Sequence, residues 1–483
     1  MNKRAVALLL ACAPLQCAEA HSFGKLYTLP VPVWLYLYGA AAALLLSFLV
    51  IGWFIGTPQD AHRNFATRPL PRQLGRLQAP AVVLVLRVLG VGLLLLCIAT
   101  GLFGSGNPYA NFNMTFFWIV FALGYAYLVA LLGDSYPLLN PWAGLLDGVQ
   151  RLWSGAWRGR RAYPERLGYA PALILYMAFI WIELFARIRP FSLATVLLGY
   201  TLISLLGAWW WGRDAWLRYG DFFGVLFRIL GRMAPLAWVD GRYVLRQPFI
   251  GLLDERCERL SLLLFVLFML SSTAFDGIHE TVPWARVFWQ GVAPALKPLI
   301  GGDIVQTFPL LKRVYAVWQT LAMVLSPFVY LAIYAALIAL AKRLAGSERS
   351  VRELCLDFGY CLVPIALVYN ITHYYTLLVT QGLLIVRLAS DPFGFGWNLF
   401  GTARWHAAPV VLDAGTVWHT QVALILLGHI VSVYLAHLVA LRVFVSPRRA
   451  LVSQLPLLVL MVAYTTIGLW ILSLPIQAGV YVP

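Results

Sequence analysis

Residues 80–102 read PAVVLVLRVLGVGLLLLCIATGL and contain a single charged side chain, Arg87. A helix of about 20 apolar residues is long enough to cross the hydrocarbon core of a membrane. Runs of this kind recur ten times along the chain, at about 31–55, 79–102, 114–133, 169–188, 191–211, 260–276, 314–341, 355–383, 416–440 and 454–475. They predict an all-α fold, a polytopic bundle of about ten transmembrane helices.

The composition of the whole chain supports this interpretation. Of its 483 residues, 61% are hydrophobic and 12% are charged, and the mean hydropathy is +0.78. Soluble domains carry roughly 25% charged residues, so a soluble fold is excluded. The net charge of +16 is explained by Arg-rich segments between the apolar runs, and no nucleic-acid partner is expected.

The Arg-rich segments predict the orientation of the bundle. About 24 Lys and Arg residues lie in the segments 56–78, 134–168, 212–259, 342–354 and 441–453, against about nine in the segments on the other side. The positive-inside rule therefore predicts that both mature termini lie outside. We expect the segment 212–259 to lie as an amphipathic helix on anionic lipid. The aromatic segments 277–313 and 384–415 are expected to cap the outer side.

The first 20 residues predict a secretory signal peptide. Lys3 and Arg4 precede an apolar run at 5–13, and Ala18 and Ala20 occupy the small-residue positions of a cleavage site. Cleavage would make His21 the first residue of a single membrane domain, residues 21–483. An uncleaved signal anchor is the alternative. Two of the six cysteines lie in the predicted signal peptide and the other four lie in spans or on the inner side, so no disulfide framework is expected. CxxC spacing is absent, so a thiolate zinc site is not expected either.

Several polar side chains lie inside the predicted spans, where an ionisable group costs a few kcal/mol and is a functional candidate by default. Asn370 and His373 share one span, and His419, His429 and His437 follow on the next. Counting residues from the predicted ends of the spans places His373, His419 and His429 in the outer half of the membrane. His437 falls near the inner end.

Further candidates reach the same outer side. Asp276 and His279 lie at the end of the run at 260–276, and cleavage of the signal peptide would add His21. Neutral imidazole binds zinc, copper, iron or nickel, so we expect a divalent metal, with zinc and copper favoured. The expected ligands are His21, His373 and His419, followed by His279 and His429. Asp276 is expected to be a ligand or the base that takes a proton from water.

Each of these residues has a structural alternative. His429 and His437 would then donate hydrogen bonds across helix contacts, and Asp276 would cap a helix end or a turn. For Arg87 and Glu183, which lie in other spans, a structural ion pair or extension of each side chain to the membrane interface is favoured over catalysis.

Several motifs spread over most of the chain resemble one known family. They are His21-Ser22-Phe23-Gly24, the stretch LPVPVWLYLYGA at 29–40, Leu139-Asn140-Pro141-Trp142, Phe275-Asp276-Gly277, His373-Tyr374-Tyr375, Gly428-His429 and Leu435-Ala436-His437. Together they are similar to the integral-membrane fenitrothion hydrolases of bacteria. The resemblance implies an organophosphate hydrolase of the bacterial inner membrane that cleaves the P–O-aryl bond of phosphorothioate triesters such as fenitrothion.

A metal at the predicted site would suit that chemistry. It would polarise the phosphoryl group and lower the pKa of a bound water, which supplies hydroxide for in-line attack on phosphorus. The aromatic outer segments would provide an apolar pocket for the aryl group of a substrate that enters from the membrane. Two other functions stay open: a transporter or metal-handling permease, and a membrane subunit without catalysis of its own. A paired subunit or a homo-oligomer is compatible with each function.

Overall fold

The structure is a computed structural model that describes residues 32–55, 65, 67–300, 304–405, 412–444 and 446–474. The predicted signal peptide and His21 lie outside the described residues, so neither the cleavage nor the expected role of His21 is addressed by the structure.

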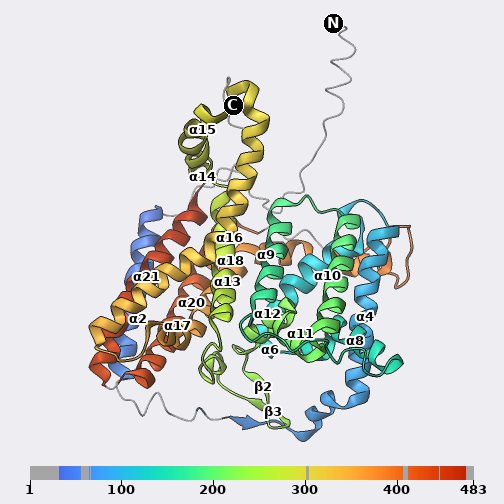
Figure 1. Cartoon of the computed structure of the whole chain (residues 1–483), viewed down its shortest axis with the longest axis horizontal. Coiled ribbons are helices and arrows are strands. Elements are labelled where there is room, and N and C mark those ends of the chain that lie inside the picture. The colour runs from blue at the N-terminus through green and yellow to red at the C-terminus, as the bar shows by residue number, and fades with distance from the viewer. Residues whose placement is uncertain are drawn as a thin grey trace.

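The described part of the chain is a bundle of long apolar helices (Figure 1). Nine of its helical segments are long and apolar enough to cross a membrane: α2 (Val33–Phe54), α4 (Pro80–Phe103), α5–η3–α6 (Phe112–Leu132), α10 (Pro190–Trp211), α13 (Leu260–His279), α16 (Ile304–Ala345), α17–η6–α18 (Val351–Gln381), α20 (Ala414–Val443) and α21 (Pro447–Ser473). The remaining expected span is the shorter α9 (Ala170–Phe185). The prediction of an all-α, multi-pass membrane bundle is confirmed.

Local sequence signals set the helix starts. Proline occupies the first position of α4, α10 and α21, where its fixed φ favours the helix and its missing N–H has no partner to lose. Asn140 caps α8 (Pro141–Leu152), because its side-chain oxygen accepts hydrogen bonds from the next two N–H groups beyond Pro141. At α17 (Val351–Phe358), Ser350 and Glu353 form a reciprocal capping box.

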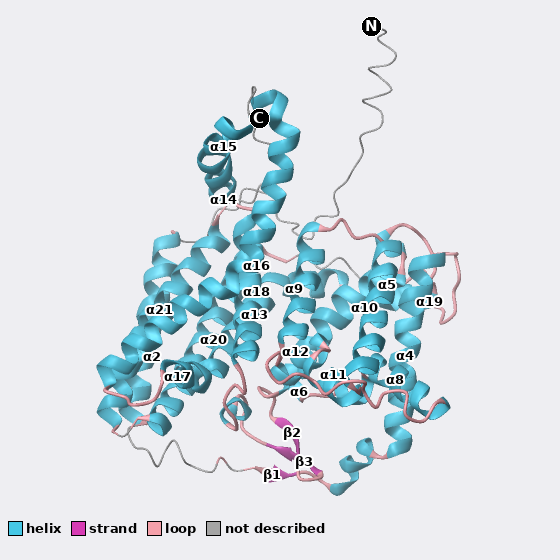
Figure 2. Cartoon of the chain, viewed as in Figure 1, coloured by secondary structure: helices cyan, strands magenta, loops and turns pink. Residues whose placement is uncertain are grey.

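Short elements gather at the arginine-rich face, which we define by the segments 67–79, 133–169, 212–259 and 346–350. They are β1 (Arg68–Pro69), η1 (Arg72–Gln78), α7 (Tyr136–Leu139), α8, α11 (Arg213–Tyr219), α12 (Phe222–Gly231), β2 (Leu236–Val239), β3 (Arg242–Leu245) and η4 (Ile250–Leu253). Figure 2 shows the three strands at this face, in the antiparallel order β1-β3-β2. Asp240 and Gly241 connect β2 to β3 with positive φ at both positions, as a two-residue hairpin turn requires.

The expectation for the segment 212–259 is wrong for most of its length. Gly212, at φ +88, separates α10 from α11, and Gly220 and Asp221 separate α11 from α12. Most residues of α12 are buried, and the helix packs inside the bundle against α6 and α9. The buried apolar residues of α12 therefore face protein, while Arg232 pairs with Glu255 at the surface, 2.7 Å away.

The opposite face carries η2 (Pro108–Ala110), α14 (Val282–Arg286), η5 (Val287–Val292), α15 (Ala293–Ile300) and α19 (Leu384–Ser390). The expected outer segment 277–313 is therefore mostly helical. Figure 1 shows α14, α15 and the first turns of α16 projecting beyond the rest of the bundle. Phe288, Ala293 and Leu311 form the small core of this projection.

Burial separates the central helices from the peripheral ones. In the most apolar 18-residue stretches of α17–α18 and α13, 83% and 72% of the residues are buried, against 17% in α2 and in α4. The helix α13 packs against α9, α16 and α18, and α18 also packs against α20 and η3. Polar side chains on α13 and α18 are therefore enclosed by protein.

Candidate functional site

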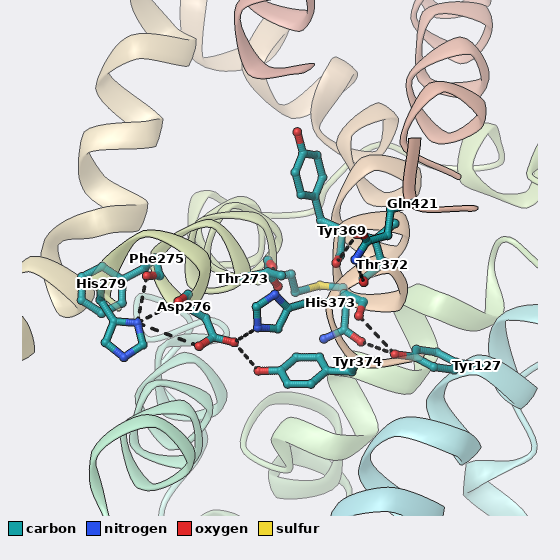
Figure 3. Close-up of polar contacts among 12 residues, drawn as sticks. Tyr127, Thr273, Phe275, Asp276, His279, Tyr369, Thr372, His373, Tyr374 and Gln421 are labelled. Carbon is teal, nitrogen blue, oxygen red and sulfur yellow. Dashed lines mark hydrogen bonds and ion pairs between the residues drawn. The ribbon is translucent and has the colours of Figure 1, made fainter. Parts of the chain in front are cut away.

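A carboxylate and an imidazole meet between the two central helices. Asp276 lies in the last turn of α13 and its side chain is 3% exposed, while His373 lies on α18. His373 Nε2 is 2.7 Å from Asp276 Oδ2, which is the distance of a charge-assisted hydrogen bond. The Tyr374 hydroxyl donates to the same oxygen at 2.6 Å. Figure 3 shows this carboxylate between the side chains of His279, His373 and Tyr374.

His279 lies on the other side of Asp276 and is bound to its own helix. Its Nδ1 donates to the backbone carbonyl of Asp276 at 2.8 Å and lies 3.2 Å from that of Phe275. The distance from Nδ1 to Asp276 Oδ1 is 3.9 Å, which is too long for a hydrogen bond. The ring stacks on Phe275 and also contacts Phe185 of α9. The His279 side chain therefore lies at the C-terminal end of α13, beside the Asp276 carboxylate.

A large cavity lies next to this cluster. Its volume is about 1270 Å³, and its wall is formed mainly by η3 (Thr115–Tyr125), α9, α12 and α18. Most of the wall is apolar, with Trp118, Phe179, Leu226 and Leu367 as examples. The segment η3 is a π-helix, a wider helix that is frequent at functional sites.

Several polar groups line the cavity. Glu183, Asn370 and Tyr374 lie in the wall, and Arg187 and Arg189 line it beyond the end of α9, on the face opposite the arginine-rich one. Glu183 is within hydrogen-bonding reach of the Tyr374 hydroxyl and close to Asp276. Tyr374 therefore connects the cavity wall to the Asp276–His373 pair.

Asn370 is held in the wall by a second tyrosine. The Tyr127 hydroxyl, from α6 (Ala126–Leu132), donates to Asn370 Oδ1 at 2.9 Å. This bond leaves the amide N–H₂ of Asn370 as the donor on a residue that lines the cavity. The wall thus presents the Glu183 carboxylate, the Tyr374 hydroxyl and the Asn370 amide to the cavity.

Two candidate histidines of α20, His419 and His429, form hydrogen bonds away from the Asp276–His373 pair. His419 is near the start of the helix, where its Nδ1 is 2.7 Å from the Gly415 carbonyl and its Nε2 is 3.1 Å from the Tyr36 hydroxyl. His429 is fully buried, and its Nδ1 is 2.8 Å from the Ile425 carbonyl. Both histidines therefore bond to the preceding turn of α20, and His429 makes no hydrogen bond to another helix through this nitrogen.

His437 forms hydrogen bonds across helix contacts, as its structural alternative predicts, and connects α20 to α2 and α21. Its Nε2 donates to the carbonyl of Ile55, at the end of α2, at 2.7 Å, and its Nδ1 accepts from the Gln454 amide of α21 at 3.0 Å.

The described residues do not fit the expected metal centre. In the ranges that the structure describes, no group of three His, Cys, Asp or Glu side chains is placed to hold a metal ion. The geometry gives the reason for the cluster at Asp276. His279 Nδ1 donates to the Asp276 carbonyl and so has no lone pair for a metal, and His373 Nε2 lies 2.7 Å from Asp276 Oδ2, directed at the carboxylate.

Sequence reasoning paired Glu183 with the wrong side chain. Arg87 binds Asp147 of α8, and Arg213 lies 2.8 Å from the other oxygen of the same carboxylate. Arg87 therefore forms a structural ion pair, but its partner is Asp147 and not Glu183. Glu183 lies instead near Asp276. The signal for Glu183 was a single carboxylate in an otherwise apolar run, which by itself does not identify its neighbours.

The arrangement can exchange protons with a molecule in the cavity. Glu183 is a carboxylate on an apolar wall, and Tyr374 links it to a buried carboxylate–imidazole pair. A carboxylate with little water around it is suited to act as a base.

Comparison with known proteins does not assign the chain to a family. No family model, no curated protein and no solved structure matches the chain.

Proposed function

We propose that the chain is a membrane hydrolase that cleaves apolar phosphoric triesters at the P–O-aryl bond inside the cavity. The observation that carries this proposal is the Glu183 carboxylate on the wall of a large, mainly apolar cavity, with Tyr374, Asp276 and His373 behind it. The motifs shared with the fenitrothion hydrolases support the choice of substrate.

The size and the lining of the cavity suit an aryl triester. Ligand sites for small organic molecules commonly measure about 300–1,000 Å³ and are mostly apolar, with a few polar groups that set the orientation. Trp118 and Phe179 would contact the aryl group, and the Asn370 amide would donate to the phosphoryl or thiophosphoryl group. An uncharged triester partitions into the membrane and can enter without losing the hydration of an ion.

In the proposed reaction, Glu183 is the general base. It takes a proton from a water molecule whose oxygen attacks phosphorus in line with the aryl oxygen. The P–O-aryl bond breaks and its electron pair leaves on the aryl oxide, so the products are a phenolate and a phosphodiester. The new P–OH group loses its proton to water, and Glu183 releases the proton that it took to solvent, which restores the base. Both products are therefore anions, and Arg187 and Arg189, which line the cavity, would favour their passage.

Tyr374, Asp276 and His373 are positioning residues in this scheme. The Asp276 carboxylate accepts from the Tyr374 hydroxyl at 2.6 Å and so fixes the tyrosine beside Glu183. His373, at 2.7 Å, fixes the carboxylate from α18. Dependence on a divalent metal, zinc or copper, stays a prediction that chelation tests, and the scheme routes no step through a metal.

The direction of access is part of the proposal. We place the entrance at the end of the cavity lined by Arg187 and Arg189, opposite the arginine-rich face, and the positive-inside rule assigns that end to the outside of a bacterial inner membrane. Cleavage would then occur on the outer side.

The test is release of nitrophenolate from an aryl phosphorothioate triester by membranes that contain the chain, against membranes without it. General-base catalysis contributes about 10²–10⁴-fold, so Glu183→Gln is expected to lower turnover by about that factor. Glu348→Gln, at an exposed position on the arginine-rich face, is the matched control and is expected to keep full activity. Full activity in Glu183→Gln protein, or no turnover by folded protein with and without added metals, would refute the proposal.

A second candidate is a transporter that moves its ligand together with a proton. The observation that favours it is the Asp276–His373 pair inside the bundle, since buried ionisable pairs often serve as proton relays in pumps and transporters. Uptake of a labelled triester into sealed vesicles, driven by a pH gradient and without nitrophenolate release, would select this candidate.

A further inference from the structure

A second concave site lies on the membrane-facing surface, between α9 and α10 and close to the arginine-rich face. It is a groove of about 740 Å³. Ile174 of α9 and Leu206 of α10 line it and are 64% and 53% exposed, although both belong to apolar helices. Trp216 of α11, which is buried, forms part of its base. Apolar side chains at this level of the bundle face lipid, so the groove is an indentation open to the membrane.

A close contact of α10 with α11 shapes this groove. A Cβ at Gly207 would lie 2.3 Å from the ring of Trp216, so only glycine allows that ring to lie against α10. Trp211 stacks on the same ring with a centroid distance of 5.9 Å. The two indoles thus hold α11 under α10 and leave the space beside α9 unfilled.

Two guanidinium groups lie at the end of the groove nearest the arginine-rich face. Arg160 is 4.1 Å from the centre of the Trp209 ring, and Arg161 is 5.5 Å from that of Trp210. The backbone N–H groups of both arginines donate to the Trp210 carbonyl, which fixes them at the end of α10. Both side chains are exposed, and within the described part of the chain no carboxylate pairs with either.

We propose that this groove binds an anionic phospholipid. Its phosphate is held by Arg160 and Arg161, and one of its acyl chains lies along Ile174 and Leu206. Charge complementarity selects an anionic lipid, because two unpaired cations flank a groove that is otherwise apolar. The acyl chain selects a lipid over free phosphate, since the groove continues from these cations along the apolar surfaces of α9 and α10. Basic pockets between transmembrane helices on the inner side are known to hold lipid headgroups.

The test uses the full chain, purified in detergent, and native mass spectrometry. The probes are phosphatidylglycerol, phosphatidylcholine with the same acyl chains, and inorganic phosphate. We expect phosphatidylglycerol to be retained in preference to the other two. The double variant Arg160→Ala/Arg161→Ala should bind it about 30-fold more weakly, because each cation near an anionic headgroup contributes roughly a factor of five.

Two further variants separate the headgroup from the chain. Leu206→Trp fills the groove without changing its charge and is expected to weaken retention of phosphatidylglycerol. Arg72→Ala/Arg76→Ala removes two exposed arginines of η1 on the same face and is the matched control, with retention unchanged.

Three results would overturn the proposal: equal retention of phosphatidylcholine, equal loss in the η1 control, or displacement of the lipid by inorganic phosphate alone. The readout does not involve hydrolysis, so it is independent of the function proposed above.

Discussion

Replacing Tyr374 with phenylalanine tests the central contact of the candidate site. The substitution keeps the ring and removes the hydroxyl that donates to Asp276 Oδ2 at 2.6 Å. Hydrogen bonds to a charged group contribute about 1.5–3 kcal/mol, more than bonds between neutral groups, and Asp276 is almost fully buried. We therefore expect Tyr374→Phe to lower the free energy of unfolding by about 2 kcal/mol.

The next residue provides a matched control. The Tyr375 hydroxyl donates to the neutral Val417 carbonyl at 3.3 Å, which is a longer bond to an uncharged acceptor. Tyr375→Phe removes the same atom from the same helix and is expected to cost at most about 0.5 kcal/mol. The difference between the two variants isolates the interaction with the carboxylate from the general effect of losing a hydroxyl on α18.

The assay is unfolding of the purified protein in mixed micelles by added denaturing detergent, followed by tryptophan fluorescence. A double-mutant cycle with Asp276→Asn should give a coupling energy between positions 276 and 374 of about 1–2 kcal/mol. Equal costs for Tyr374→Phe and Tyr375→Phe, together with no coupling to Asp276, would refute the assignment of Tyr374 as the link between the cavity and the buried pair.

The remaining predictions concern packing and charge near the arginine-rich face. Gly207→Ala should destabilise the protein by about 1–3 kcal/mol through its clash with Trp216, whereas Gly199→Ala, on the same helix with open space around it, should be neutral or stabilising in the same unfolding assay. Asn140→Asp keeps the cap of α8 but places a second carboxylate beside Asp221, whose oxygen is 2.8 Å from the Asn140 amide; we expect a loss of about 2 kcal/mol at neutral pH that acid restores, and a loss unchanged by pH would contradict this. Burial raises the pKa of Asp221 above its ordinary value despite the hydrogen bonds it accepts. The folded state therefore holds this proton more tightly than the unfolded state, so stability should fall as pH rises through the raised pKa, and Asp221→Asn should flatten the pH dependence of unfolding.

Much of the fold was predictable because membrane spans are recognised from length and polarity. Every expected apolar run corresponds to a helix, and the run at 169–188 is the one that forms a shorter helix, α9. Counting depth along the spans also placed Asp276 and His373 on the same outer side, and the structure has them in contact. Depth is a one-dimensional property that the sequence carries directly.

The partners around the site were not predictable in the same way. A helix that is apolar on all sides shows no preferred face, so its sequence does not indicate which neighbour a given residue meets. His419 and His429 were placed near His373 by depth, yet both bond to the preceding turn of α20. An ion pair between Glu183 and Arg87 was one of two alternatives for these residues, but Asp147 of α8 pairs with Arg87, and Glu183 of α9 lines the cavity. These outcomes depend on helix rotation, which packing between distant segments sets.

The same reasoning explains why the segment 212–259 was wrongly predicted to form an amphipathic helix on lipid. Arginines spaced among apolar residues predict an amphipathic helix both for a surface on lipid and for a surface on protein. The two cases differ only in what covers the apolar side, and here α6 and α9 cover α12. Gly212 and the Gly220–Asp221 pair are the local signals that the segment could not form one continuous helix.

Polar groups are distributed differently on the peripheral helices and on the central helices of the bundle. The peripheral helices α2 and α4 present apolar side chains to lipid, and the one charged residue of α4, Arg87, lies in the first third of the helix and is held by Asp147 at the arginine-rich end. On the central helices, Asp276 and His373 lie where protein replaces lipid, so their ion pair and the hydrogen bond from Tyr374 limit the cost of burial. A polar pair enclosed on all sides would serve stability alone. Because Tyr374 and Glu183 connect this pair to a large cavity, its protonation can respond to what the cavity contains, and this is the physical basis on which we assign the site a chemical role.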